Sequence, residues 1–505
     1  MSDNRGVRAK KNIATSLLSQ LVLILCGFIV PRLMIGAFGS EVYGATTSIT
    51  QFLGYITLLE GGIGSVARAA LYHPLAHKDQ SALNSIINEI KRFFRVIAWV
   101  FLGYVVILAF SFKSISDIQC LDWISTFLLV VVISISTFGQ YFIGISNSIL
   151  LQASQKLYIT NIVSIVTTII NTILTVVLIT LDCNVIIVKL VSSCIFFMRP
   201  VILWIYVKRN FLLDSKFKPD KTKKYLTQKR TGLGQHLAFF LHTNTDVVVL
   251  TVFSDLKSVA VYAVYNMVIS NLQNLTTSFS SGMESIFGDM YAKKEHKTLQ
   301  STFVFYETLI SIVSVALFST AMVLILPFVK LYTAGISDAD YIQPILALIM
   351  IMISLSYCLR TPYHSMIIAA GHFKQTSIAA YGEAIINIAL SIGLVFKFDL
   401  NGVAIATLIA TWFRFIFYLY YLSKNILYIK IMLFVKRLAV NILIIALSLV
   451  IGNFFVHTFD INNYFMWAIC GLVTFVSISI LTLGLNFLFY KNNCCALITK
   501  FIKKN

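Results

Sequence analysis

Apolar segments about twenty residues long recur from one end of this 505-residue chain to the other, with short polar stretches between them. A helix of that length crosses the roughly 30 Å hydrocarbon core of a bilayer. Only 12% of the residues are charged, whereas about 25% is usual for a soluble domain. The short alternating segments that form transmembrane barrels do not occur in the sequence. The pattern therefore predicts an all-α polytopic membrane protein.

The polar interruptions divide the chain into about fourteen expected transmembrane helices. They are predicted near residues 13–36, 43–70, 93–112, 123–150, 158–180, 184–207, 232–253, 259–288, 304–328, 341–370, 375–396, 401–422, 434–456 and 464–490. The N-terminus starts basic and turns apolar, as a signal peptide does. Its apolar run is long and many further spans follow, so we interpret it as a retained first helix.

The distribution of positive charge predicts the orientation. If the spans alternate in direction, 30 of the 40 Lys and Arg residues lie on the side of both termini, four lie on the other side, and six lie within spans. Positively charged loops resist translocation, so both termini are expected in the cytoplasm. The net charge of +19 then reflects basic loops that face anionic lipids, and no nucleic-acid partner is expected.

The chain also shows weak similarity to itself at a shift of 215 to 218 positions. FFMRPVILWIYVKRN (196–210) lies over TWFRFIFYLYYLSKN (411–425), which aligns Arg199 with Arg414 and Tyr206 with Tyr421. The shift maps odd-numbered spans onto odd-numbered spans, which indicates a parallel repeat of two six-helix lobes around a central cavity. The predicted parts are an N-terminal lobe (1–207), a basic cytoplasmic linker (208–231), a C-terminal lobe (232–425), and two further helices with a basic tail (426–505).

Charged residues inside the spans are the candidate functional residues, because a charge at the bilayer centre costs about 2.5 kcal/mol or more. Arg199 and Arg414 lie near the middle of their spans. They either line a wet cavity or pair with an acid on a neighbouring helix. Arg360 precedes Pro362, which should kink its helix. The repeat matches this position with the region around Gly144, and paired helix breaks indicate a binding region.

Acidic residues in the spans could balance these arginines or carry a proton. Glu60 lies beside Gly61 and Gly62, which weaken the helix and allow it to bend. His242 and Asp246 are four residues apart, so they share a helix face and either transfer a proton or hold helices together. Two weaker cavity candidates, also four residues apart, are Glu383 and Asn387; hydrogen bonding between helices is an equal alternative for them.

Three more charged residues lie near span ends and are interpreted as gates or as interface anchors: Arg32, Arg68 and Glu284. Lys189 is close enough to the outer end of its span to reach the interface. The eight cysteines contain no CxxC pair, and no metal site is predicted. No phosphate-binding loop and no catalytic triad pattern occurs, so no cofactor is predicted and the chain is not expected to be an enzyme.

Several motifs resemble those of the Wzx-type bacterial polysaccharide flippases, in the multidrug/oligosaccharidyl-lipid/polysaccharide (MOP) exporter superfamily. These motifs are KKNIATSLLSQ (10–20), FGSEVYG (38–44), LLEGGIGSVARAALYHPLAHKD (58–79), HTNTDVVVLTVF (242–253) and AAGHFKQT (369–376). The resemblance covers nearly the whole chain. It implies twelve plus two spans in a bacterial plasma membrane.

The resemblance also implies a cargo, undecaprenyl-diphosphate-linked oligosaccharide, which moves to the outer leaflet by alternating access. Arg199, Arg414 and Arg360 would then hold the diphosphate, with Glu60, Asp246 and His242 in charge balance or proton coupling. Other polysaccharide-assembly proteins are further candidate partners. Two alternatives stay open: an ion-coupled small-molecule exporter of the same superfamily, and a membrane polysaccharide polymerase or ligase, against which the short outer loops argue.

Overall fold

The protein is described by a computed structural model that covers residues 3–60, 63–213, 244–278 and 280–490, and every regular element in these ranges is a helix. Ten of these helices are long and apolar enough to cross a membrane. This confirms the predicted polytopic helical fold. The contacts divide the chain into two compact units: unit 1 is Met1–Phe240 with Asp255–Ala260, and unit 2 is Leu241–Ser254 with Val261–Asn505.

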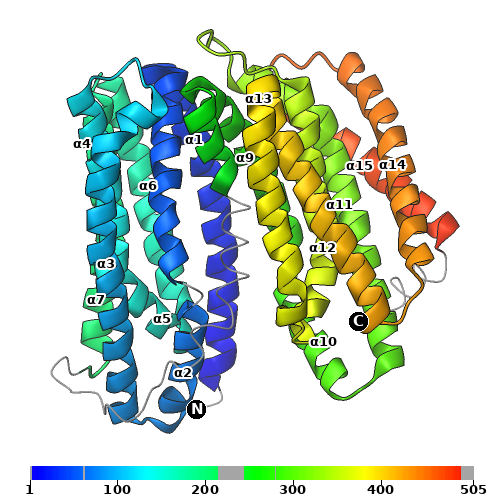
Figure 1. Cartoon of the computed structure of the whole chain (residues 1–505), viewed down its shortest axis with the longest axis horizontal. Helices are drawn as coiled ribbons and strands as arrows, with labels where there is room; N and C mark the ends of the chain where they lie inside the picture. Colours follow the sequence, from blue (N-terminus) through cyan, green and yellow to red (C-terminus); the bar gives the residue numbers. More distant parts are fainter. Residues whose placement is uncertain (1–2, 61–62, 214–243, 279, 491–505) are drawn as a thin grey trace. The chain divides into compact units, whose positions relative to one another are not determined.

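Unit 1 contains the first seven α-helices (Figure 1). It also contains a 3-10 helix and a π-helix. The elements are α1 (Asp3–Gly54), a 3-10 helix (Tyr55–Glu60), α2 (Ile63–His77), α3 (Gln80–Ser116), α4 (Trp123–Gly139), a π-helix (Gln140–Gly144), α5 (Ile145–Ala153), α6 (Leu157–Thr180) and α7 (Val185–Asn210). Most of the predicted linker lies outside the described residues.

Unit 2 repeats this order and adds two helices. It begins with a short apolar helix (Asn244–Phe253) and continues with α9 (Leu256–Thr277, whose first residues belong to unit 1), α10 (Ser280–Ala292), α11 (His296–Tyr332), α12 (Pro344–Ala369), α13 (Phe373–Asn425), α14 (Ile431–Thr458) and α15 (Tyr464–Phe489). Helix α12 continues through Pro362 without interruption.

Two of these helices each contain two predicted spans. The chain changes direction within α1 at Gly39 (φ 84°) and within α13 at Asp399 (φ 47°), where one residue leaves the helical conformation. Glycine has no Cβ, so Gly39 adopts a positive φ without strain. Asp is one of the few other residues that tolerate a positive φ. The loops expected at these positions are therefore reduced to sharp turns.

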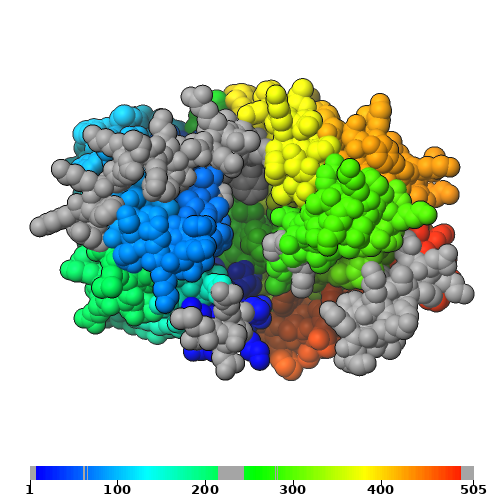
Figure 2. Space-filling view, turned by 90° about the horizontal axis from the view of Figure 1, so that it is seen from below, coloured from blue at the N-terminus to red at the C-terminus, as the bar shows by residue number. Residues whose placement is uncertain are grey.

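Helix α3 starts thirteen residues before its predicted span at residue 93. Asp79 caps it by accepting a hydrogen bond from the Ala82 N–H (2.9 Å), and the added turns bury Ile86 and Ile90. Figure 2 looks onto the end of unit 1 where α2 and these first turns of α3, in mid-blue, form the surface. Hydropathy detects only the part of a helix that lies in lipid. The sequence therefore did not predict the amphipathic start of α3.

The backbone conformation shows the internal repeat more clearly than the sequence does. Four residues with positive φ recur at shifts of 216 to 218 positions, and the pairs are Lys78 and Lys294, Asp117 and Gly335, Gln155 and Gly371, and Asp182 and Asp399. Each pair occupies the turn after equivalent helices of units 1 and 2. The end of the 3-10 helix at Glu60 in unit 1 likewise corresponds to the end of α9 at Thr277 in unit 2.

Side chains at one of these turns also correspond. In unit 1, the Lys156 Nζ lies 5.5 Å from the ring centroid of Tyr206. In unit 2, the His372 Nδ1 lies 2.9 Å from the hydroxyl of Tyr421. Tyr206 and Tyr421 are the two tyrosines that the sequence alignment matched. In both units, therefore, the turn before the fifth helix of the repeat contacts the end of the sixth.

Candidate functional sites

Two irregular helical segments of unit 1 border a pocket of about 500 Å³. The 3-10 helix contributes Thr57 and Glu60, and the π-helix contributes Gln140 and Tyr141. The other lining residues are Ser136, Thr137, Ile145, Phe196 and Arg199. Short 3-10 and π segments inside longer helices often mark functional positions. Non-helical backbone at membrane depth is tolerated where it lines a water-filled cavity.

Local sequence explains why the helices deviate here. The 3-10 helix ends at Glu60, and the sequence that follows, GGIG, is rich in glycine. A Cβ on Gly144, at the end of the π-helix, would lie 2.5 Å from the Gln140 Oε1 and 3.0 Å from the Pro200 Cβ. Glycine at this position therefore allows α7 and the Gln140 side chain to approach closely. The Tyr141 hydroxyl donates a hydrogen bond to Glu60, which joins the two irregular segments.

Arg199 lines this pocket from α7 and is held by hydroxyl groups of α6. Its Nε donates to the Thr167 Oγ1 (2.6 Å) and its Nη2 to the Thr168 Oγ1 (2.7 Å). Its guanidinium carbon lies 4.3 Å from the ring centroid of Phe196. Within the described ranges, its Nη1 has no hydrogen-bond partner and no carboxylate forms an ion pair with it. The pocket thus contains a positive charge fixed in position by neutral groups.

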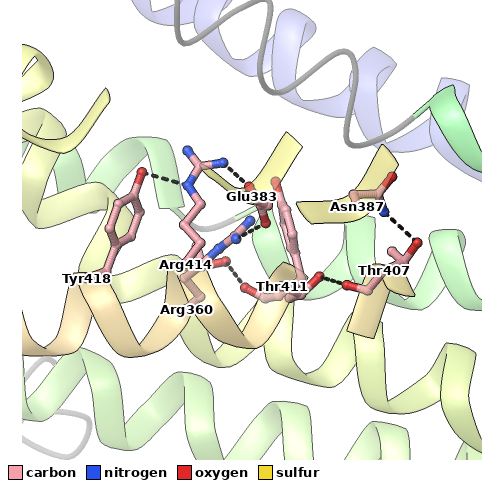
Figure 3. Close-up of polar contacts among 9 residues, drawn as sticks. Arg360, Glu383, Asn387, Thr407, Thr411, Arg414 and Tyr418 are labelled. Atoms are coloured by element: carbon pink, nitrogen blue, oxygen red, sulfur yellow. Dashed lines mark hydrogen bonds and ion pairs between the residues drawn. The ribbon is translucent and has the colours of Figure 1, made fainter. Parts of the chain in front are cut away.

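Arg360 and Arg414 lie in a different environment, the interior of unit 2. Both pair with Glu383: the Arg360 Nη1 lies 2.5 Å from its Oε1, and the Arg414 Nη1 lies 2.5 Å from its Oε2 (Figure 3). The Arg414 Nε also donates to the Tyr418 hydroxyl (2.8 Å). The Glu383 side chain is fully buried, and the two arginine side chains are 5% and 4% exposed. In this conformation Arg414 therefore adopts the paired alternative that the sequence left open.

A second polar cluster of unit 2 surrounds Asp246. Its carboxylate accepts hydrogen bonds from the Tyr262 hydroxyl (2.8 Å) and the Thr407 Oγ1 (2.8 Å). The Asn387 Nδ2 donates to the same Thr407 oxygen (2.7 Å), as Figure 3 shows. Asp246 and Asn387 are both buried. His242, predicted as the partner of Asp246, lies outside the described residues, so that pairing stays a prediction.

The predicted gate residues contact neutral partners near the helix ends. In unit 1, the Arg68 Nη1 donates to the Gln152 Oε1 (2.8 Å). In unit 2, the Ser365 Oγ donates to the Glu284 Oε1 (3.3 Å). Arg68 and Glu284 are 216 positions apart, so the repeat places them at equivalent points of α2 and α10. Arg32 lies half-buried in α1.

The sequence analysis missed a buried ion pair in unit 2. Arg437 lies within α14 and pairs with Glu307 of α11. The Tyr363 hydroxyl donates to the same carboxylate (2.9 Å). Both residues lie close to the starts of the predicted spans 304–328 and 434–456, where a charge was expected to reach the headgroups, but α11 and α14 begin earlier and place both charges inside the bundle. The sequence signal for this ion pair was a single glutamate, Glu307, near the start of a long apolar segment.

Comparison with known proteins identifies the fold. No protein-family model and no curated protein matches the sequence. The structure is similar to that of the lipid II flippase MurJ in an inward closed conformation, with a TM-score of 0.68, 16% identity, and coverage of 95% of this chain and 99% of that chain. The chain shares its fold with this flippase. At this identity the similarity shows the fold alone.

Multidrug transporters of the MOP superfamily share this fold to a lesser extent. An inward-facing MATE transporter gives a TM-score of 0.57 at 13% identity, over 80% of this chain and 98% of that chain. The eukaryotic MATE transporter AtDTX14 gives 0.58 at 12% identity, over 83% and 96%. The MurJ match therefore covers more of the chain than these two matches do. None of the three identifies the Wzx type that the sequence motifs resemble.

Proposed function

We propose that this protein is a flippase that moves undecaprenyl-diphosphate-linked oligosaccharides from the cytoplasmic to the outer leaflet of a bacterial plasma membrane, for surface polysaccharide synthesis. It has both termini in the cytoplasm and works by alternating access. The MOP fold, shared with a lipid II flippase, and the motifs of the Wzx type support this proposal. The observation that carries it is the difference between two equivalent arginines.

Arg199 and Arg414 are 215 positions apart, and so are the residues that hold them, Thr168 and Glu383. The repeat has thus placed a hydroxyl in unit 1 where unit 2 has a carboxylate. Arg414 is paired with a buried carboxylate within the protein, whereas Arg199 keeps its charge beside a pocket. A diphosphate carries about two negative charges, and an arginine with unused N–H groups is the side chain best suited to bind its oxygens.

We therefore assign the diphosphate to Arg199 and a different role to Arg360 and Arg414. With Glu383 between them, these two arginines hold α12 to both halves of α13. An interhelical ion pair of this kind is costly to break, because one partner is left buried and uncompensated. As phosphate ligands they would have to leave Glu383, so a role in cargo binding requires another conformation of unit 2.

We further propose that Asp246 couples transport to an ion. It is a buried carboxylate whose oxygens accept from two hydroxyl groups, an arrangement that suits reversible protonation. In inverted vesicles, collapsing the proton gradient should stop flipping by the wild type, and Asp246→Asn should flip slowly and without response to that gradient. Dependence on a sodium gradient, with no response to the proton gradient, would instead assign a metal cation to this carboxylate.

The deciding experiment is depletion of the protein in a strain without a redundant flippase. If the protein is a flippase, lipid-linked oligosaccharide should accumulate on the cytoplasmic face. Expression of the Arg199→Gln variant should not relieve this accumulation, although the variant is inserted normally. A polymerase would instead leave single repeat units on the outer face. A small-molecule exporter would leave the polysaccharide intact and raise sensitivity to toxic cations; either result would overturn the proposal.

A further inference from the structure

The pocket of unit 1 contains more chemistry than a diphosphate requires. Phosphate oxygens are bound by hydrogen-bond donors and cations, which Arg199 supplies. The pocket also presents a carboxylate, Glu60, an amide, Gln140, and the hydroxyl of Thr57. A carboxylate repels a phosphate group but accepts hydrogen bonds from neutral hydroxyl groups. The wall that carries Glu60 and Gln140 is therefore suited to a neutral, hydroxyl-rich group next to the phosphate.

Aromatic rings complete this wall. Tyr141 and Phe196 line the same pocket, and Phe196 lies against the Arg199 guanidinium. Pockets that combine aromatic surface with a few placed polar groups bind small ligands in a fixed orientation. A pyranose ring matches this arrangement, because its C–H faces pack on aromatic rings while its hydroxyls point outward. The volume of about 500 Å³ lies within the range of sites for ligands of this size.

The backbone provides an independent observation. The polar residues of this wall come from the 3-10 helix and the π-helix, two interruptions in helices far apart in the sequence. Each interruption leaves the regular hydrogen-bond pattern of an α-helix, which costs stability in a membrane. Tyr141 links them by donating to Glu60. The 3-10 helix and the π-helix thus contact each other, and polar side chains of both line the same pocket.

We propose that this pocket is the subsite for the sugar attached directly to the diphosphate. Arg199 binds the phosphate nearest to the sugar. Sugar hydroxyls donate hydrogen bonds to Glu60 and replace the one from the Tyr141 hydroxyl. The Gln140 amide forms hydrogen bonds with the adjacent ring substituents. The pocket would then select the cargo by its first sugar, whatever follows it in the repeat unit. This inference rests on the proposed function, because it presupposes a sugar diphosphate as cargo.

Binding of short water-soluble probes to the full-length protein in lipid nanodiscs tests the subsite. The probes are geranyl diphosphate, which has no sugar, and its esters with N-acetylglucosamine, N-acetylgalactosamine and galactose. The wild type should bind at least one ester at least tenfold more tightly than geranyl diphosphate. In Gln140→Leu and Glu60→Gln this ratio should fall below about threefold. Arg199→Gln should weaken binding of all four probes.

Gln119→Leu, the same change in the exposed turn between α3 and α4, is the matched control and should keep the wild-type ratio. Thermal unfolding of each variant checks that it is folded. Equal binding of all probes by the wild type, or an unchanged ratio in both pocket variants, would overturn the subsite while leaving the flippase intact. If the wild type bound none of the four probes, the proposed function itself would fail together with the subsite.

Discussion

Arg414 and Glu383 lie on the two halves of α13, and the guanidinium of one contacts the carboxylate of the other at 2.5 Å with almost no access to solvent. Arg360 of α12 binds the second oxygen of the same carboxylate. One acid thus fixes three helical segments of unit 2. The whole group carries a single net positive charge.

Glu383→Gln should destabilise the protein strongly, because it leaves two neighbouring buried guanidinium groups without a carboxylate. Breaking a buried ion pair in this way costs about 3–5 kcal/mol. Thermal unfolding, followed by size-exclusion chromatography of the detergent-solubilised protein, should show a lower midpoint. Ile385→Ala, on the outer surface of the same helix at 66% exposure, is the control and should have little effect. An unfolding midpoint equal to that of the wild type, with transport lost, would make the arginines cargo ligands instead.

Gly144→Ala should destabilise unit 1, because the added Cβ would overlap with Gln140 and crowd Pro200. Overpacking of this kind typically costs about 1–3 kcal/mol. Gly103→Ala in α3 is the matched control: its Cβ would meet no atom within 4 Å, and alanine favours a helix over glycine by about 0.5–1 kcal/mol. The two substitutions should therefore shift the unfolding midpoint in opposite directions. Shifts in the same direction would contradict the close approach of α7.

Thr167 and Thr168 position Arg199, so Thr167→Val with Thr168→Val should reduce cargo binding without removing the charge. Hydrogen bonds to a charged group contribute about 1.5–3 kcal/mol, which corresponds to a tenfold or greater loss of affinity. The apparent KM of flipping should rise, and the unfolding midpoint should fall because the folded protein loses both hydrogen bonds. Thr167→Ser with Thr168→Ser keeps both hydroxyls and should restore the KM. Failure of the serine variant to restore it would mean that the threonine methyl groups, through packing, matter more than the hydroxyls.

Cys120 tests the orientation of the chain by its reactivity. It lies in the turn between α3 and α4, where Glu41 accepts hydrogen bonds from the backbone N–H groups of Gln119 and Cys120. Burial, with the nearby Glu41 carboxylate, raises the pKa of the Cys120 thiol to about 11. Only the thiolate reacts, so labelling should be slow at pH 7.5 and rise about tenfold per pH unit through pH 9.5.

The measurement uses right-side-out vesicles, a membrane-impermeant maleimide and a Cys183→Ser background. Glu41→Gln should speed labelling at pH 7.5, because it removes the negative charge that disfavours the thiolate. A plateau above pH 9 would show an ordinary thiol. Labelling only after the vesicles are opened would place this turn in the cytoplasm and reverse the predicted orientation.

The sequence predicted the fold well because its main determinant, the need to satisfy every backbone group in lipid, acts on long apolar segments that are visible in any single chain. It also predicted weakened helix geometry next to Glu60, where the structure has a 3-10 helix. The sequence predicted interruptions at residues 37–42 and 397–400, but not that each would be a sharp turn made by one residue, Gly39 or Asp399, because hydropathy carries no information on backbone dihedral angles.

The environment of each charge was harder to predict. Arg199 and Arg414 look alike in sequence, and what separates them is a contact with α6 in one unit and with the first half of α13 in the other. Such partners lie about 31 residues away along the chain, on a helix face that hydropathy does not specify. The Tyr141 contact with Glu60 was missed for the same reason, because a π-helix changes which side chains share a face.

The matching left-handed turns also bear on how the chain originated. Two of the four pairs keep a positive φ with no glycine, and the other two have glycine in one member only, although non-glycine residues rarely adopt it. Independent halves would have little reason to place them at the same register. A tandem duplication of one six-helix ancestor accounts for all four. After it, one copy exchanged a carboxylate for a threonine hydroxyl, or the other gained a carboxylate, and the arginines of the two halves came to lie in different surroundings.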